Sequence, residues 1–200
     1  MSKKSMWSFK LSTVSLVMIP VAVCINYVGK LFASALKLPL WLDSIGTVLA
    51  SMLGGPILGA LSGAINNIIF GLTADPMSFV YAGTSIAIGL VAGILAYKGW
   101  MNNFGKALVS GLIVSIVAAV VSTPLNIKFW GGQTGNAWGD AVFGAMMAKQ
   151  SSLWLASFVD EVLVDVPDKI VTVLISFAIF KSLPKQLTSL FASEDEIKQL

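Results

Sequence analysis

The stretch from Leu153 to Leu183 reads LWLASFVDEVLVDVPDKIVTVLISFAIFKSL, an apolar run long enough to cross a membrane, with charged residues inside it. These charged residues are Asp160, Glu161, Asp165, Asp168 and Lys169. A carboxylate at mid-bilayer costs about 2.5–3.5 kcal/mol even on the gentler scales, so it is tolerated mainly beside a wet cavity, a partner group or the interface. The stretch therefore predicts a membrane helix that borders a polar site.

The composition of the whole chain is that of an integral membrane protein. Of its 200 residues, 56% are hydrophobic and 12% are charged, and the mean hydropathy is +0.84, whereas a soluble domain has about 25% charged residues. The apolar runs are continuous rather than alternating, which disfavours a membrane β-barrel. Since a helix needs about 20 apolar residues to cross the bilayer, we expect an all-α protein with one transmembrane domain of six helices.

The six predicted spans are separated by segments that contain glycine, proline or polar residues. They cover approximately residues 11–36, 42–53, 56–70, 79–97, 107–123 and 153–183, and a short cytoplasmic tail follows over 184–200. We expect a kink at Pro20 and a long, Trp-rich functional loop from Pro124 to Ser152. Eight lysines fall on the side of the termini and five on the other, so the N- and C-termini are predicted to be cytoplasmic.

The residue types that are missing disfavour several functions. Without histidine the chain lacks the commonest general base and the usual zinc ligand, so we expect neither enzymatic activity nor a metal site. A net charge of +3 is too weak to suggest a nucleic-acid partner. Between Gly99 and Gly105 lie five residues, and Ala107 stands where a phosphate loop has Ser or Thr. Any ATP is therefore expected to be used by partner subunits.

The acids near the C-terminus are predicted to divide into two groups. Helical spacing of four, three and four places one stripe of polar residues on a single face: Glu161, Asp165, Asp168 and Thr172. If the helix proper begins near Val166, Asp165 is its N-cap, Asp168 lies at the third position and Pro167 occupies the permissive first turn. Asp165 and Asp168 are then helix-start residues, and Asp160 and Glu161 are the better candidates for contact with a ligand.

Three segments resemble the substrate-binding S components of energy-coupling factor (ECF) vitamin transporters. They are LPLWLDSIGT at 38–47, GGPILGALSG at 54–63 and DKIVTVLISFAIFKSLP at 168–184. The resemblance implies a six-helix bundle in a bacterial cell membrane that captures a vitamin or related micronutrient at its outer face. It also implies a transmembrane coupling subunit and two cytoplasmic ATPases as partners, with no cofactor on this chain. Cobalamin, a pyridoxine-type ring and a modified nucleobase all stay open as substrates.

The predicted substrate-binding residues are amides, tryptophans and acids expected at the outer side of the bundle. Amide groups would form hydrogen bonds with the substrate, and tryptophans would stack on it or anchor the chain at the interface. The acids favour a neutral or cationic ligand. The predicted set is Asn26, Trp41, Asp43, Asn67, Trp130, Gln133, Asn136, Trp138 and Glu161.

Small residues at a spacing of four have two interpretations, internal helix packing or docking of the coupling subunit. Gly55, Gly59 and Gly63 follow this spacing. S components commonly carry an Ala-x-x-x-Ala pattern on the first helix, and the nearest match here is Gly29 to Ala33. The predicted docking residues are therefore Ala22, Gly55, Gly59 and Gly63.

Two other functions stay open at the level of the sequence. One is a secondary transporter that couples to protons through Glu161 or Asp165, and the other is a membrane sensor module. Uptake by the chain alone in ATP-free vesicles would distinguish a secondary transporter from an ATP-dependent importer.

Overall fold

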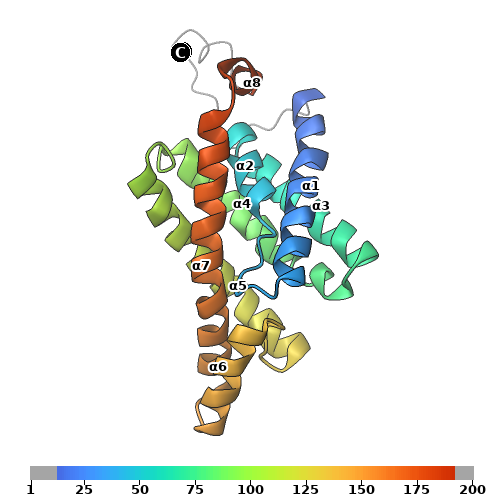
Figure 1. Cartoon of the computed structure of the whole chain (residues 1–200), viewed down its shortest axis with the longest axis vertical. Coiled ribbons are helices and arrows are strands. Elements are labelled where there is room, and N and C mark those ends of the chain that lie inside the picture. Colours follow the sequence, from blue (N-terminus) through green and yellow to red (C-terminus); the bar gives the residue numbers. More distant parts are fainter. Residues whose placement is uncertain (1–12, 192–200) are drawn as a thin grey trace.

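The computed structural model describes residues 13–191, and the chain is all-α over this range, as predicted (Figure 1). No strand occurs within these residues. The elements are α1 (Thr13–Ala35), α2 (Ile45–Gly54), α3 (Pro56–Thr73), η1 (Pro76–Phe79), α4 (Ala82–Tyr97), α5 (Phe104–Trp130), α6 (Ala137–Ala148), α7 (Leu153–Ser182) and α8 (Lys185–Ser189).

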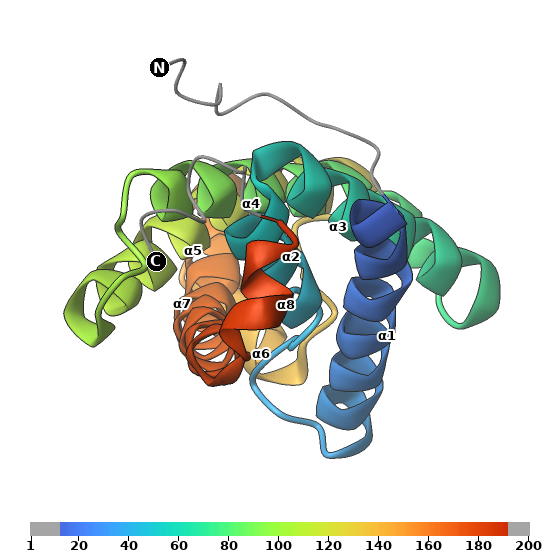
Figure 2. The same cartoon turned by 90° about the horizontal axis from the view of Figure 1, so that it is seen from above.

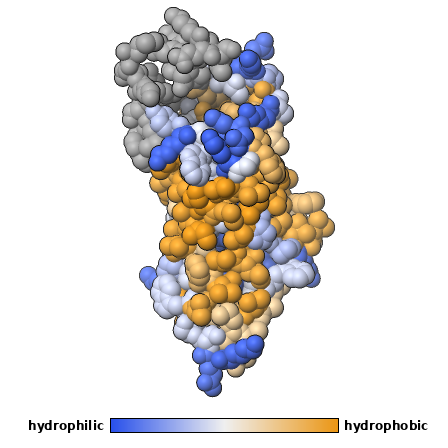
Figure 3. All heavy atoms as spheres, turned by 90° about the vertical axis from the view of Figure 1, so that its left-hand side faces the viewer, coloured by the Kyte–Doolittle hydropathy of each residue, from blue (hydrophilic) through white to orange (hydrophobic). Residues whose placement is uncertain are grey.

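Three of the described helices, α1, α3 and α5, are long and apolar enough to cross a membrane. α2 and α4 are shorter apolar helices, and α7 is long but carries the acidic cluster. An apolar band separates two more hydrophilic ends on the face shown in Figure 3. These features indicate a membrane-embedded protein, whereas the number of crossings and the side of the termini stay predictions.

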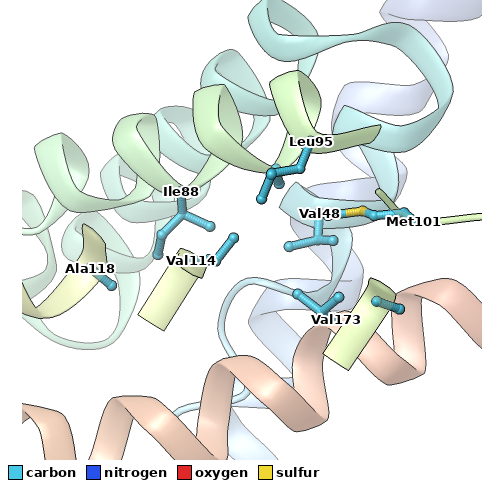
Figure 4. Packing of buried hydrophobic residues seen from close by; sticks show 9 residues of the cluster. Val48, Ile88, Leu95, Met101, Val114, Ala118 and Val173 are labelled. Atoms are coloured by element: carbon cyan, nitrogen blue, oxygen red, sulfur yellow. The ribbon is translucent and has the colours of Figure 1, made fainter. Parts of the chain in front are cut away.

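The short helix α2 lies at the centre of the bundle, in contact with α1, α3, α4 and α7. All residues from Ile45 to Ser51 are buried, so α2 has no face free for lipid. Figure 4 shows Val48 of α2 in one apolar cluster with Ile88 of α4, Val114 of α5 and Val173 of α7. This cluster joins α7 to α2 and α4, which lie in the first half of the chain.

Close approach of helix backbones explains why glycine recurs in α3 and α4. A Cβ added at Gly89 of α4 would lie 2.8 Å from the Cα of Ala60 in α3 and closer still to the backbone of Gly59. Such a contact is shorter than real Cβ atoms make, and the obstacle is backbone rather than a flexible side chain. The α3–α4 interface therefore requires a residue without a side chain at this position.

We expect Gly89→Ala to destabilise the protein by about 1–3 kcal/mol, because an overpacked interface forces backbone shifts. Gly83→Ala is the matched control on the same helix, since a Cβ there meets no atom within 4 Å. That variant should be neutral or gain about 0.5–1 kcal/mol from helix propensity. Thermal unfolding in detergent micelles measures both variants, and equal midpoints would contradict the packing argument.

The expectation of a long loop from Pro124 to Ser152 is wrong. α5 continues through Pro124 to Trp130, and α6 occupies Ala137–Ala148. Membrane helices tolerate proline because neighbouring hydroxyl groups, water and local adjustment satisfy the freed backbone groups. Pro124 leaves the Val120 carbonyl without its helical N–H, and the hydroxyl of the neighbouring Thr123 donates to the Ala119 carbonyl at 2.7 Å.

A helix start near Val166 is also wrong, because α7 runs without a break from Leu153 to Ser182 and contains Pro167. Its 30 residues span about 45 Å at 1.5 Å per residue, longer than the roughly 30 Å of a bilayer core. In Figure 1 the start of α7 lies with α6 at one end of the molecule, and its last turn lies near α8 at the other. Asp160, Glu161 and Asp165 therefore lie in the first half of one long helix, and Asp168 lies at its middle.

Candidate binding cavity

A cavity of about 120 Å³ lies among α1, α4, α5, α7 and the segments that connect them. Four acids and two lysines line it together with hydroxyl groups and apolar side chains. The lining residues are Lys30, Trp41, Asp43, Asp75, Met77, Ser78, Tyr81, Thr84, Ser85, Ile88, Ser122, Thr134, Gly135, Glu161, Asp165 and Lys169. A cavity of this size and polarity is large enough for several waters or one small molecule.

The ammonium of Lys169 is the electrostatic centre of one wall. It lies 3.5 Å from Asp43 Oδ1 and 3.6 Å from Asp165 Oδ1, and it also pairs with Asp168 Oδ2. The Lys169 side chain is only 3% exposed. One buried cation thus compensates three carboxylates that come from α7 and from the α1–α2 loop (residues 36–44).

Asp43 shows how this arrangement acts on a carboxyl group outside the helices. Burial alone raises the pKa of Asp43, but the nearby charges of Lys169 and Lys30 outweigh burial, so its pKa is lower than usual. A hydrogen bond of 2.7 Å from the Ser44 hydroxyl supports the ionised form in the same direction. Asp43 therefore stays charged at neutral pH.

Asp168 fixes the α1–α2 loop to α7. Its Oδ1 accepts hydrogen bonds from the backbone amides of Trp41 at 3.0 Å and Leu42 at 2.8 Å. Leu42 has a φ of 51°, a left-handed conformation that a bulky residue adopts only when its surroundings impose it. Asp168 is thus a loop anchor rather than the helix-start residue expected from the sequence.

A hydrogen-bonded chain forms a second wall and orients Glu161. The Tyr81 hydroxyl donates to Asn126 Oδ1 at 2.6 Å, and Asn126 Nδ2 donates to Glu161 Oε2 at 2.7 Å. Both Asn126 and Glu161 are buried. The donated N–H fixes one oxygen of Glu161 and keeps the side chain at the cavity.

Asp165 lies one helical turn after Glu161 and presents an unsatisfied atom. Its Oδ1 faces Lys169, but its buried Oδ2 has no hydrogen-bond partner among residues 13–191 while both acids are ionised. A lone buried carboxylate oxygen is costly, so the site is incomplete without a proton, a water or a ligand. This residue was expected to cap a helix, and it instead lines the cavity.

Lys30 of α1 is the second lysine in the cavity lining. Its ammonium donates to Ser78 Oγ at 2.8 Å and lies 4.4 Å from the centre of the Phe70 ring. Such a cation–π contact stabilises the position of the ammonium by about 0.5–1 kcal/mol or more. Lys30 therefore has partners of its own and does not neutralise Glu161 directly.

Of the nine predicted binding residues, Trp41, Asp43 and Glu161 line the cavity. Asn26 instead serves the start of α2: its Oδ1 accepts from the Gly46 amide at 2.7 Å, and its Nδ2 donates to the Thr47 hydroxyl at 2.9 Å. The first turn of a helix has amides without helical partners. Asn26 thus caps α2 from a neighbouring helix.

Asn67 lies immediately behind the cavity. Its Nδ2 donates to the Gly63 carbonyl at 3.1 Å and to the hydroxyl of Ser85, a lining residue, at 2.6 Å. Asn67 therefore positions a hydroxyl group at the wall without belonging to the wall itself.

Four predicted residues between the end of α5 and the start of α6 are not among the cavity-lining residues: Trp130, Gln133, Asn136 and Trp138. Asn136 Nδ2 donates to the Leu38 carbonyl at 3.2 Å, and Trp138 Nε1 donates to the Lys37 carbonyl at 3.2 Å. Gln133 is exposed and Trp130 ends α5. The start of α6 thus holds the same α1–α2 loop that Asp168 holds from α7.

Asp160, which was expected to contact a ligand, is not among the cavity-lining residues but contacts one of them, Thr134. Its Oδ1 accepts a hydrogen bond of 3.0 Å from the Thr134 hydroxyl, and Thr134 also donates its amide to Asp140 Oδ1 at 3.0 Å. Asp160 and Asp140 therefore fix the segment between α5 and α6. The neighbouring Glu161 is about 100° further around the helix and lines the cavity.

Several lining residues were missed by the sequence reasoning. Tyr81 and the hydroxyl groups of Thr84, Ser85 and Ser122 come from helices whose overall composition is apolar. The signal available in the sequence was the presence of hydroxyl residues in apolar helices. In the structure, the hydroxyl groups of Thr84 in α4 and Ser122 in α5 form a hydrogen bond of 3.0 Å. When it is not known which helices pack together, a hydroxyl that lines a cavity cannot be distinguished from one that bonds to the backbone of its own helix, as Ser and Thr often do.

The predicted docking residues are used mainly within the chain. Ala22, Gly59 and Gly63 are buried, and Gly55 is partly exposed. A Cβ at Gly63 would lie 3.0 Å from the Ser85 Cβ, and one at Gly59 would lie 2.9 Å from the Ser51 Cβ. Their small size therefore serves packing among α1–α4, and a partner could not reach the three buried residues without opening the bundle.

Comparison with known proteins adds no further constraint. No protein-family model, no curated protein and no solved structure matches this chain. The function is therefore argued from the cavity itself.

Proposed function

We propose that this chain is the substrate-binding membrane subunit of an ATP-driven importer of the energy-coupling factor type. The observation that carries the proposal is a cavity with buried charges inside an apolar, all-helical chain. Buried ionisable groups in membrane helices are costly and mark substrate or ion pathways. A purely structural bundle would have no need for six charged residues around one empty space.

Energy for import would come from partners. The chain offers no nucleotide-binding motif, so the proposal requires a transmembrane coupling subunit and two cytoplasmic ATPases. Six crossings with both termini in the cytoplasm of a bacterium belong to the same proposal. The Lys30 and Lys169 sides of the cavity belong to separate helices, α1 and α7, so a movement between these helices would open the site.

The size of the cavity restricts the substrate. A volume of about 120 Å³ is close to the roughly 150 Å³ of an engineered cavity that binds benzene. This size suits a single small ring, and it favours a pyridoxine-type or nucleobase-type compound over cobalamin. Trp41 and Tyr81 line the cavity and offer aromatic surface to such a ring.

The test is purification of the tagged full-length chain, in mild detergent, from a bacterium that encodes it. We expect a coupling subunit and ATPases to co-purify, and mass spectrometry to identify a small ring compound released on denaturation. The released compound is then offered to vesicles that hold either the chain alone or the whole complex. Uptake that needs the complex and internal or external ATP supports the proposal, and uptake by the chain alone without ATP contradicts it.

A proton-coupled secondary transporter is the second candidate, and one observation favours it. Glu161 and Asp165 lie one helical turn apart on the same face of α7, and both line the cavity. Acid pairs of this kind serve as proton relays in membrane transporters. Uptake by the chain alone, driven by an inward proton gradient and abolished by Glu161→Gln, would establish this alternative.

A further inference from the structure

We propose that the cavity selects a small organic cation, whose protonated nitrogen lies between Glu161 and Asp165. The assignment of this cation as transported cargo rests on the proposed function, whereas its binding to the cavity does not. The inference starts from the charges that the cavity leaves uncompensated.

The charge balance of the lining is negative. Asp43, Asp75, Glu161 and Asp165 face two lysines. Lys169 is already shared by Asp43, Asp165 and Asp168, and Lys30 is held by Ser78 and Phe70. An anionic substrate would add to this excess, and a neutral one would leave it unchanged. A cation reduces it, and that gain is large where water is scarce.

Within the cavity lining, Glu161 and Asp165 are two carboxylates without a cation of their own. Glu161 receives the Asn126 amide on Oε2, and this neutral donor does not cancel its charge. One turn further along α7, Asp165 Oδ2 is buried and has no partner among the described residues. Both side chains line the cavity, and both residues are more than nine-tenths buried. An ammonium or a protonated ring nitrogen carries the donors that these two carboxylates lack.

The remaining walls suit the rest of a small ring. Trp41 and Tyr81 provide aromatic surface, and Met77 and Ile88 provide apolar surface. Aromatic faces also attract cations. The hydroxyl groups of Thr84 and Ser122 are already bonded to each other, so they do not require a hydrogen bond from the ligand. The site thus combines an acidic end with an aromatic and apolar remainder.

The experiment compares three probes of one shape and different charge: benzylamine, which is protonated at neutral pH, benzyl alcohol and benzoate. Binding to the purified full-length chain in lipid nanodiscs is measured by calorimetric titration, up to about 10 mM probe. We expect benzylamine to bind at least about tenfold more tightly than benzyl alcohol, and benzoate not to bind. Tenfold is the discrimination that one favourable charged contact commonly provides.

Two isosteric variants locate the cation. Glu161→Gln and Asp165→Asn each remove one negative charge, and each should reduce the preference for benzylamine over benzyl alcohol by about tenfold or more. Asp160→Asn is the matched control, because it makes the same charge change on the same helix, outside the cavity lining. The new amide oxygen can still accept a hydrogen bond from Thr134. The preference of this variant for benzylamine over benzyl alcohol should stay within about twofold of that of the parent protein.

Equal binding of the three probes, tighter binding of benzoate, or no binding of benzylamine overturns the inference. An equal loss of preference in Asp160→Asn also overturns it, since the effect would then be one of net charge. These results leave the importer proposal to its own test. Conversely, a cation preference in the chain together with ATP-independent uptake would retain the binding site and refute the importer.

Discussion

Replacing Lys169 with methionine is expected to lower the free energy of unfolding by about 3–5 kcal/mol, because it leaves buried carboxylates without their cation. Asp43, Asp165 and Asp168 all lie around this one ammonium, and the side chain is only 3% exposed. Methionine has a similar length, so the effect is one of charge rather than of lost volume. Reversible unfolding in mixed micelles, followed by circular dichroism, measures the change.

Lys181→Met is the matched control for this variant. Lys181 lies near the end of the same helix and is exposed, so the same substitution should change stability by less than about 0.5 kcal/mol. Adding Asp165→Asn to Lys169→Met removes one uncompensated carboxylate and should recover part of the loss. If Lys169→Met and Lys181→Met unfold at the same midpoint, the central role of Lys169 is refuted.

Asp168→Ala should have an effect of similar size, about 3 kcal/mol or more, and should also free the α1–α2 loop. The variant loses the two backbone bonds to Trp41 and Leu42 and one carboxylate partner of Lys169. Hydrogen exchange measures the second effect, because both amides lose their acceptor. We expect exchange in the peptide containing residues 41 and 42 to accelerate by about tenfold or more.

Asp168→Asn separates the two roles of this side chain. The amide oxygen can still accept from both backbone amides, but the negative charge opposite Lys169 is gone. Amide exchange in the loop should then stay near that of the parent, while the free energy of unfolding falls. Unchanged loop exchange in Asp168→Ala would show that something other than this carboxylate holds the loop.

The helical class was predictable because it depends on composition and on long apolar runs. An error in the position of one helix end does not change this class. The predicted segments 11–36 and 56–70 lie close to α1 and α3. The predicted span 153–183 also lies close to α7. The errors occurred at prolines: Pro124 was taken as a helix limit and Pro167 was assigned to a first helical turn, yet both lie inside helices. Proline ends helices in water, where the freed carbonyl can be solvated, whereas packed membrane helices continue through it.

The binding site was harder to predict than the fold, because polar residues in a membrane protein have two uses. Trp41, Asp43 and Glu161 were predicted and line the cavity. Asn26 looks equivalent in the sequence, but it caps α2. An amide that binds a ligand and an amide that satisfies a distant backbone have the same local pattern. Only the pairing of helices separates them, and a single sequence does not contain that pairing.

The anchoring of the α1–α2 loop also sets an order of events during synthesis. The acceptor for the Leu42 amide is Asp168, 126 residues later in the chain. At about 5–20 residues per second, translation takes roughly 6–25 s to cover that distance. The nascent protein therefore inserts its first helices with an untethered loop and an open cavity. The residues at the start of α6 that contact the loop are made earlier than Asp168. Lys169 follows Asp168 by one residue, so a single late stretch of translation completes the anchoring of the loop and supplies the cation beside Asp43.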